Sequence, residues 1–289
     1  MVQEQIEIDG IKYKLDDYNA IVVWKKYEGK VVIPSEIVFN GKTYFVKIIG
    51  DNAFHSCERL TSIAIPNSVS KIEDFAFSDC SSLESVTIPE NVREIGAGAF
   101  KSCTQLTSVV IPEGVYIIKS FTFEGCSKLY SVVFPNTIKE IGYKSFFGCS
   151  NLFSITLPEG IVRIMGEAFS YCSKLTSLYI PSSVELIGKR AFFACNSLQL
   201  IEVGTNNKMY NSSNGCNAIM ETRTNTLVLG CKATIIPPKT KIIGEGAFCS
   251  CKDLTSLEIP DEVTKIECFD VINISYHKFA GLERNYKNQ

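Results

Sequence analysis

The chain has 289 residues, a length that corresponds to one or two domains. With 45% hydrophobic and 21% charged residues, its composition is that of a folded protein and argues against a largely disordered chain. Lysine and arginine total 29, while aspartate and glutamate total 31, so the formal charge is −2. We therefore expect no nucleic-acid partner, because no basic excess is present to neutralise phosphates.

The first segment, residues 1–48, is predicted to be a β-rich N-terminal cap. Its alternating strand runs are separated by turns such as Asp9-Gly10 and Asn40-Gly41, pairs that are typical of tight hairpins. The only tryptophan, Trp24, is expected to close the core against the first repeat. An independent small domain is the alternative, although 48 residues are few for autonomous folding.

Secretion and membrane insertion are judged from the same segment. The acidic start at residues 1–9 differs from the basic and then apolar start of a signal peptide, so the chain is not secreted or lacks its leader. The apolar run at residues 20–24 is far shorter than the ~20 residues that span a bilayer. We expect no membrane span in this chain.

From Ile49 to Ile266 the sequence repeats every 23 residues, which predicts a stacked-repeat protein. Each unit opens with isoleucine, and a phenylalanine follows five residues later. These phenylalanines are Phe54, Phe77, Phe100, Phe123, Phe146, Phe169, Phe192 and Phe248. A cysteine follows eight residues after the opening isoleucine, at Cys57, Cys80, Cys103, Cys126, Cys149, Cys172 and Cys195.

Each unit is predicted to be one coil of a solenoid. A leucine and two apolar residues spaced two apart, as in Leu60, Ile63 and Ile65, predict a short strand, which the following proline ends because it has no N–H. The stretch between the opening isoleucine and the cysteine is long enough for a turn or two of α-helix or 3-10 helix. A single coil buries too few side chains to fold alone, so the coils must stack, with their strands in one parallel sheet.

The repeat is interrupted at about residues 204–235. Gly204 stands where other units have proline, and the Asn-rich stretch 205–217 is expected to loop out. The apolar runs 218–220 and 227–229 predict a hairpin, and a strand end at 235–237 is expected to restore the register. The insertion is either part of a binding face or a surface decoration. Residues 267–289 are predicted to form a C-terminal cap or tail.

The unit consensus, I-G-x-x-A-F-x-x-C-x-x-L-x-S-I-x-I-P, resembles the leucine-rich repeat class of BspA-like surface proteins. The resemblance implies an α/β repeat fold, namely a right-handed solenoid with a parallel sheet on its concave face and short helical turns. It also implies an extracellular or cell-surface location, a role in adhesion, and binding of a host or matrix protein, or of a glycan, without catalysis.

The cysteines are expected to be reduced and buried. Equivalent residues in adjacent coils lie roughly 4.8 Å apart, whereas disulfide Cβ atoms prefer ~3.8 Å. The sequence contains no paired Cys-x-x-Cys motifs with matching histidines, which is the pattern that would indicate a zinc site. Cys216 and Cys231 flank the predicted hairpin and are disulfide candidates if the chain is extracellular, while Cys249 is expected to point away from the cysteine column and to be accessible.

We expect neither catalysis nor a cofactor or metal. His55 occupies a variable outer position and is expected to be a surface side chain, and His277 has no candidate co-ligand nearby. No nucleophile elbow, zinc-protease motif, phosphate loop or dinucleotide fingerprint is present. The chain is therefore predicted not to be an enzyme.

The outward side of the predicted sheet supplies the candidate ligand-binding residues Tyr130, Phe153, Tyr179 and Glu202. Aromatic side chains exposed on a rigid face are frequent binding groups. The neighbouring column of serines, which begins at Ser62, favours the other interpretation of a crowded, inert face. Two functions follow: a monomeric binding module, or a structural, self-assembling surface protein without a specific ligand.

Overall fold

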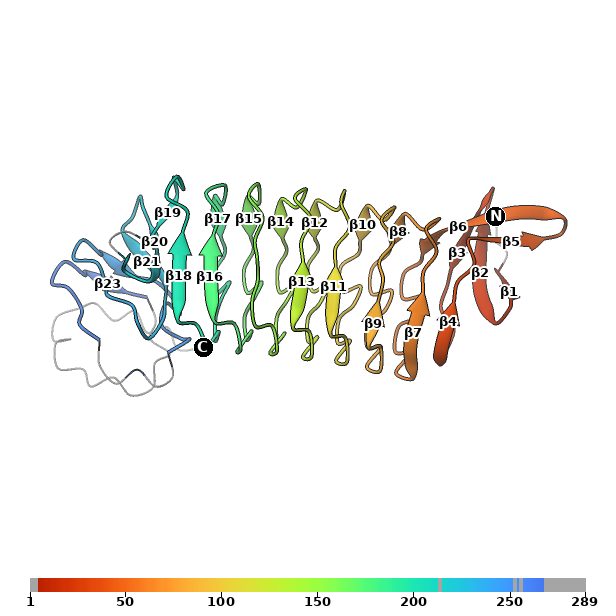
Figure 1. Cartoon of the computed structure of the whole chain (residues 1–289), viewed down its shortest axis with the longest axis horizontal. Coiled ribbons are helices and arrows are strands. Elements are labelled where there is room, and N and C mark those ends of the chain that lie inside the picture. Colours follow the sequence, from red (N-terminus) through yellow and green to blue (C-terminus); the bar gives the residue numbers. More distant parts are fainter. Residues whose placement is uncertain (1–4, 213–214, 252–253, 255–256, 268–289) are drawn as a thin grey trace.

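The computed structural model describes residues 5–212, 215–251, 254 and 257–267. The chain forms a long stack of coils, with the N-terminal strands at one end and the coils advancing regularly from them (Figure 1). The repeat seen in the sequence is therefore a repeat in space.

Six strands make up the N-terminal end: β1 (Gln5–Ile8), β2 (Ile11–Asp16), β3 (Asn19–Val22), β4 (Gly29–Val32), β5 (Glu36–Phe39) and β6 (Lys42–Ile49). Strands β1, β2 and β3 pair in antiparallel order, and β5 forms a hairpin with β6. Strand β6 also pairs in parallel with β3 and with β8 of the first coils. The N-terminal sheet thus continues directly into the stack.

The coils contribute two rows of strands. The row that follows the leucine column consists of β7 (Leu60–Ala64), β9 (Ser85–Val86), β11 (Ser108–Val110), β13 (Ser131–Val133), β16 (Ser177–Ile180) and β18 (Leu200–Val203). The row that contains the opening isoleucines consists of β8 (Lys71–Ile72), β10 (Glu94–Ile95), β12 (Ile117–Ile118), β14 (Glu140–Ile141), β15 (Arg163–Ile164) and β17 (Leu186–Ile187). Both rows run along the stack in Figure 1. We call the solvent side of the first row the sheet face.

The expectation of one continuous parallel sheet is wrong in detail. The first row is divided into β4–β7–β9, β11–β13 and β16–β18, and the second into two ladders, one that ends at β10 and one formed by β12, β14, β15 and β17. Pairing within each part is parallel, with a register of 23 residues such as Ile141 with Ile164. Each strand of the first row is only a few residues long, and all except β18 are followed by a proline that lacks an N–H, so few ladder bonds are available and the ladder breaks easily.

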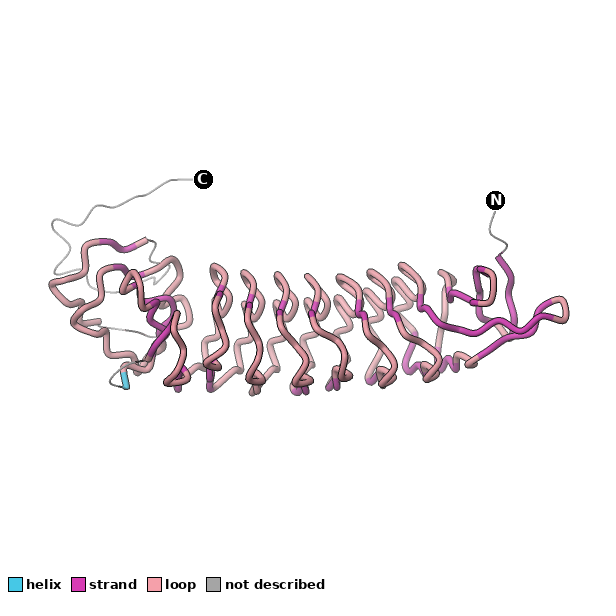
Figure 2. The backbone as a smooth tube through the Cα atoms, turned by 90° about the horizontal axis from the view of Figure 1, so that it is seen from above, coloured by secondary structure: helices cyan, strands magenta, loops and turns pink. Residues whose placement is uncertain are grey.

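The predicted helical turns are also wrong, and with them the α/β class. In the first coil, Ala53 N–H donates to Gly50 O (3.1 Å), whereas Phe54 N–H donates to Ala76 O of the next coil (2.7 Å). A helix needs consecutive bonds within one segment, and here they alternate with bonds between coils. Left-handed backbone at Asn52 (φ 55°) interrupts the turn as well. Among the described residues the single helical position is Gly215, outside the coils (Figure 2).

The phenylalanine column forms the centre of the core. From Phe54 to Phe192 the rings stack in sequence, with centroids 4.9–5.5 Å apart. Tyr27, not Trp24, closes this column, because its ring lies 4.5 Å from that of Phe54. Trp24 is 53% exposed and donates its indole N–H to His55 O (3.3 Å). The tyrosine suits the buried position because its hydroxyl donates to Val23 O (3.2 Å), which satisfies the polar atom inside.

The interruption and the coils after it form a separate five-stranded sheet of β19 (Tyr210–Asn211), β20 (Ala218–Glu221), β21 (Thr226–Gly230), β22 (Ile242–Ile243) and β23 (Lys265–Ile266). Strands β20 and β21 form the predicted hairpin. The strand end expected at 235–237 is not a strand, and β22 restores the parallel register instead, by pairing with β21 and then with β23. The core also divides here, because Met220, Leu227 and Ile243 belong to a second hydrophobic cluster.

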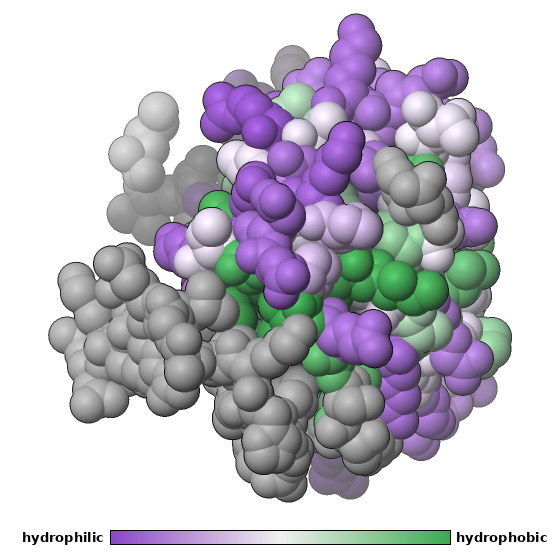
Figure 3. Space-filling model, turned by 90° about the vertical axis from the view of Figure 1, so that its left-hand side faces the viewer, coloured by the Kyte–Doolittle hydropathy of each residue, from purple (hydrophilic) through white to green (hydrophobic). Residues whose placement is uncertain are grey.

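Seen from its C-terminal end, the described stack shows hydrophobic residues at the centre of the face and polar residues around them (Figure 3). Val263 is buried there, and Leu257, Ile259 and Ile266 are partly buried. The C-terminal cap predicted at 267–289 lies outside the described residues, apart from Glu267.

Candidate binding surface

The four candidate ligand-binding residues lie on the sheet face and are exposed. Tyr130 is 55% exposed, Phe153 58% and Tyr179 45%, and Glu202 is exposed as well. Tyr130 and Phe153 occupy equivalent positions in adjoining coils, and Tyr179 pairs with Glu202 across β16 and β18. The structure therefore brings all four onto one surface.

The backbone beneath these side chains is held by hydrogen bonds between coils. Tyr130 N–H donates to Thr107 O of the preceding coil (2.9 Å). Phe153 O accepts from Thr176 N–H of the following coil (3.2 Å). Such positions keep their geometry whether or not a ligand is present, so the rings form a fixed pattern.

Apolar residues of the outward columns that were not among the four candidates extend this surface. Val110 is 62% exposed, Val133 52% and Leu200 48%, all on the outward side of the first row. A valine in a strand is equally compatible with a place in the core, and only its position in the two-residue alternation shows whether its side chain points inward or outward. The surface is therefore an apolar strip, with serines between the larger side chains.

Gly204, which stands in place of the consensus proline, has a structural role beside this strip. A Cβ at Gly204 would lie 2.9 Å from the Tyr179 hydroxyl oxygen and 2.5 Å from Ser182 Oγ. Glycine thus leaves the space that the tyrosine ring occupies. The loss of proline from the consensus was the sequence signal of this arrangement.

The seven column cysteines, Cys57 to Cys195, are buried and free, as predicted. Their thiols also make contacts that the sequence did not reveal. Cys126 Sγ donates to Phe100 O of the preceding coil (3.1 Å), and the same bond recurs from Cys80 to Cys195 with distances of 3.1–3.3 Å. Cysteine is suited to this column because it fits like a small hydrophobe and also pairs a buried carbonyl.

Burial changes the acidity of these thiols. Desolvation raises the pKa of Cys126 and that of Cys195 to about 12, and it raises the pKa of Cys103, Cys149 and Cys172 well above the ordinary value. The cause is the absence of solvent around the charged form. These groups stay protonated and unreactive near neutral pH.

Among the described residues, the three cysteines outside the column, namely Cys216, Cys231 and Cys249, differ from expectation. Cys216 and Cys231 are free and buried, and Cys231 Sγ approaches Asn217 O (3.8 Å), so no disulfide joins them. Cys249 is also buried rather than accessible. Cys216 belongs to the second hydrophobic cluster, whereas Cys231 belongs to the main core of the coils.

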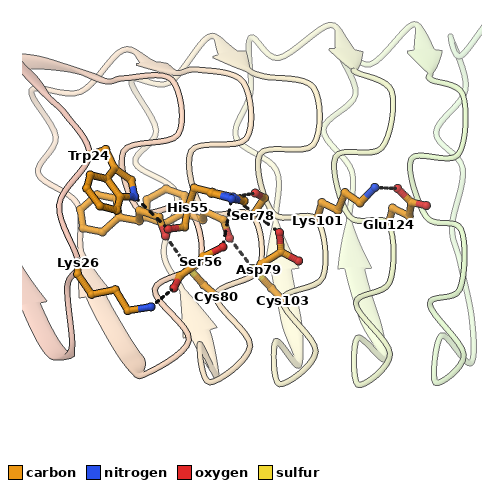
Figure 4. A network of polar contacts seen from close by, with 12 residues as sticks. Trp24, Lys26, His55, Ser56, Ser78, Asp79, Cys80, Lys101, Cys103 and Glu124 are labelled. Atoms are coloured by element: carbon orange, nitrogen blue, oxygen red, sulfur yellow. Dashed lines mark hydrogen bonds and ion pairs between the residues drawn. The ribbon is translucent and has the colours of Figure 1, made fainter.

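His55 belongs to a polar network on the outer turns of the first coils, and is more than an isolated surface side chain (Figure 4). Its Nδ1 lies 2.6 Å from Ser78 Oγ and 3.7 Å from Asp79 Oδ2, and its Nε2 lies 3.1 Å from Ser56 Oγ. Both ring nitrogens are therefore occupied by hydroxyl groups of the same turns. The arrangement links adjacent coils, which is a structural role.

Neither a metal centre nor a membrane helix is found in the part of the chain that the structure describes. No group of three or more histidine, cysteine, aspartate or glutamate side chains is placed to hold an ion there. No helix among these residues has the length and apolar character needed to cross a bilayer.

Comparisons with known proteins agree with this architecture. A leucine-rich cell surface protein from Faecalibacterium prausnitzii is 28% identical, with a TM-score of 0.74 over 91% of this chain and 72% of that chain. The T. pallidum leucine-rich repeat protein is 30% identical, with a TM-score of 0.61 over 68% of this chain and 91% of that one. The pneumococcal vaccine antigen PcpA, 20% identical with a TM-score of 0.57, shares the fold over 94% of this chain and 69% of its own.

Comparison with curated proteins gives no significant match. The family model for the BspA-type leucine-rich repeat region matches residues 36–138, 93–220 and 229–286 in six copies. These ranges cover most of the chain and include the regular coils, the interruption and the coils after it. The chain therefore belongs to the BspA-type leucine-rich repeat family.

Proposed function

We propose that this protein is a non-catalytic recognition module at a cell surface that binds an extended segment of another protein through its sheet face. The observation that supports this most directly is the exposed strip of Tyr130, Phe153 and Tyr179 on backbone held by bonds between coils. Aromatic side chains dominate the energetics of many protein interfaces. A rigid surface also loses little conformational entropy on binding.

The shape and charge of the strip indicate the kind of segment that fits. The rings are distributed over three successive coils, so a ligand must be extended to contact all of them. Glu202 pairs with Tyr179 across the strands and places a negative charge at one end of the strip. A segment with apolar side chains and one basic residue near its end matches this pattern.

The cell-surface location is supported by similarity. The Faecalibacterium prausnitzii protein is described as a leucine-rich cell surface protein. The family supports a role in protein interaction. Host or matrix proteins are the first partners to test, and a glycan is the alternative ligand.

The alternative function, self-assembly, is disfavoured because the backbone donors on the edge of strand β18 already have acceptors within the chain. Ile201 N–H donates to Asn217 Oδ1 (2.6 Å), and Val203 N–H donates to Ser212 Oγ (3.0 Å). These donors at the edge strand are therefore occupied and do not pair with a second copy. This supports a monomer, and light scattering at several concentrations measures it, because self-assembly would raise the mass with concentration.

Replacing Tyr130, Phe153 and Tyr179 together by serine is expected to lower partner affinity by more than about tenfold, since three exposed anchors are lost. Binding of the full chain to immobilised extracellular-matrix extract measures this, with folding checked by circular dichroism. The matched control replaces Tyr116, Tyr143 and Tyr171, which are 38–56% exposed elsewhere on the coils, by serine.

The control variant should bind like the wild type. Equal binding by the sheet-face variant and the wild type would contradict the proposal. A glycan array tested with the same three proteins provides the second arm. If binding appears only on the glycan array and is lost in the sheet-face variant, the sheet face remains the binding surface, but the ligand is a glycan and not a protein.

A further inference from the structure

The outer turns of the coils are joined by a regular set of hydrogen bonds, which we call the turn ladder. At each of the six junctions between coils from Ile49 to Ile187, three backbone N–H groups of one turn donate to carbonyls of the next, with distances of 2.6–3.2 Å. Phe169 N–H to Ala191 O (2.7 Å) and Tyr171 N–H to Phe193 O (2.7 Å) are two of them. The ladder is one of the most regular features of the fold.

The turn ladder stops at the interruption. Phe192 and Ala194 are the equivalents of Phe169 and Tyr171 in the last regular coil, but their N–H groups have no acceptor among the described residues. Both residues are buried, with exposures of 2% and 5%. Almost all buried backbone donors in proteins are paired, so an unpaired one indicates a missing partner.

A cleft lies where the next turn would have supplied those acceptors. It has a volume of about 150 Å³ and is bounded by the turn at 187–193, by β21 and by the turn at 244–246. The inserted strand β21 creates it, because Val228 and Leu229 take the place of a regular coil. Ser250 Oγ accepts from Cys195 N–H (3.1 Å) and donates to Phe192 O (3.2 Å), so the two coils remain in contact beside the cleft.

The size and walls of the cleft indicate a small ring. An apolar cavity of about 150 Å³ accommodates one benzene ring. The walls include Ile187, Ala191, Phe192, Val228 and Leu229.

The charges near the cleft favour an uncharged ligand. Lys189 and Arg190 both face Glu245, with distances of 3.6 Å and 3.9 Å. Glu267, which also lines the cleft, is paired with Lys265 (2.7 Å). Each of these charged side chains thus has an oppositely charged partner. Of the two unpaired donors, only Phe192 belongs to the lining of the cleft, so the polar group that a ligand there must satisfy is the Phe192 N–H.

We propose that this cleft is an anchor pocket for the phenol ring of a tyrosine presented by a protein partner. The ring lies against the apolar walls, and its hydroxyl oxygen accepts the hydrogen bond from Phe192 N–H that the turn ladder leaves unmade. Phe193, which lines the cleft at the end of the same turn, gives the rest of the segment an aromatic surface. The pocket is separate from the sheet face and independent of the function proposed there.

Amide NMR of the ¹⁵N-labelled full chain tests this. Addition of p-cresol is expected to shift the Phe192 amide signal and to slow its hydrogen exchange. Toluene should bind roughly two- to tenfold more weakly, because it lacks the hydrogen-bond acceptor. N-acetyl-tyrosine amide should compete with p-cresol. If this blocked tyrosine does not compete, the cleft binds free phenols only, and the proposal of a tyrosine presented by a protein partner is overturned.

Val228→Phe fills the cleft and should abolish the p-cresol shifts, whereas Val32→Phe, at a 70% exposed position, should leave them unchanged. If Val228→Phe does not fold, the exchange rate of the wild-type Phe192 amide with and without p-cresol remains decisive. No change at Phe192 at millimolar p-cresol, or shifts that persist in folded Val228→Phe, would overturn the proposal. The sheet-face triple variant should bind p-cresol normally, so the two proposals fail separately.

Discussion

Replacing Phe123 by alanine is expected to reduce the free energy of unfolding by about 3–5 kcal/mol, as is usual for a buried aromatic residue truncated to alanine. Phe123 is fully buried, and its ring lies 5.5 Å from that of Phe100 and 5.3 Å from that of Phe146. The substitution removes one ring and leaves two others with a cavity between them. Urea titration followed by circular dichroism measures the change.

Tyr116→Ala is the matched control, because it truncates an aromatic side chain that is 56% exposed on an adjacent part of the same stack. Its effect is expected to stay within about 0.5 kcal/mol of zero. A loss below 1 kcal/mol for Phe123→Ala would show that the phenylalanine column is not the core of the fold.

Raising the pH from 8 to 10 is expected to destabilise the protein strongly. Burial raises the pKa of the column thiols, to about 12 for Cys126 and Cys195, whereas the same groups ionise near pH 9 once the chain unfolds. Above that pH the unfolded chain loses protons that the native state keeps, so stability falls as pH rises. At pH 10 each buried thiol contributes a loss of about 1.4 kcal/mol. Urea midpoints at pH 8 and pH 10 measure the total.

Cys126→Ala separates the thiol effect from general alkaline unfolding. It should lower stability at pH 8 but weaken the further loss at pH 10 by about 1.4 kcal/mol. A thiol-reactive dye gives an independent readout, since the column cysteines should react only after denaturant is added. A pH profile identical to that of the wild type, together with rapid labelling of native protein, would show that the column is accessible.

The periodic part of the fold could be predicted from the sequence. The 23-residue spacing of isoleucine, phenylalanine, leucine and cysteine placed the core columns correctly, because each coil meets the same neighbours and therefore needs the same side chains. The alternation after the leucine also oriented Tyr179 outward, and Tyr130 and Phe153 were assigned to the column that flanks the outward positions. These are consequences of side-chain periodicity, which the sequence carries directly.

The errors arose where backbone contacts between coils decide the structure. The seven residues between Ile49 and Cys57 are compatible with a helical turn, and only the turn ladder, whose acceptors lie in the next coil, excludes it. Likewise, Trp24 and Tyr27 are both aromatic, and the sequence does not show which of them lies on Phe54. The cleft at Phe192 arises from the position of an inserted strand and has no sequence motif.

The most direct test of recognition through the sheet face is to locate the bound partner. The photo-crosslinker p-benzoyl-phenylalanine is placed at position 153 on the sheet face or at position 171 on an outer turn, and each full chain is irradiated with extracellular-matrix extract. We predict that the crosslinker at position 153 forms an adduct with the partner. Excess wild-type protein should suppress this adduct, whereas an excess of the sheet-face triple variant should not. An equal or stronger adduct from position 171, or equal suppression by both competitors, would contradict recognition through the sheet face.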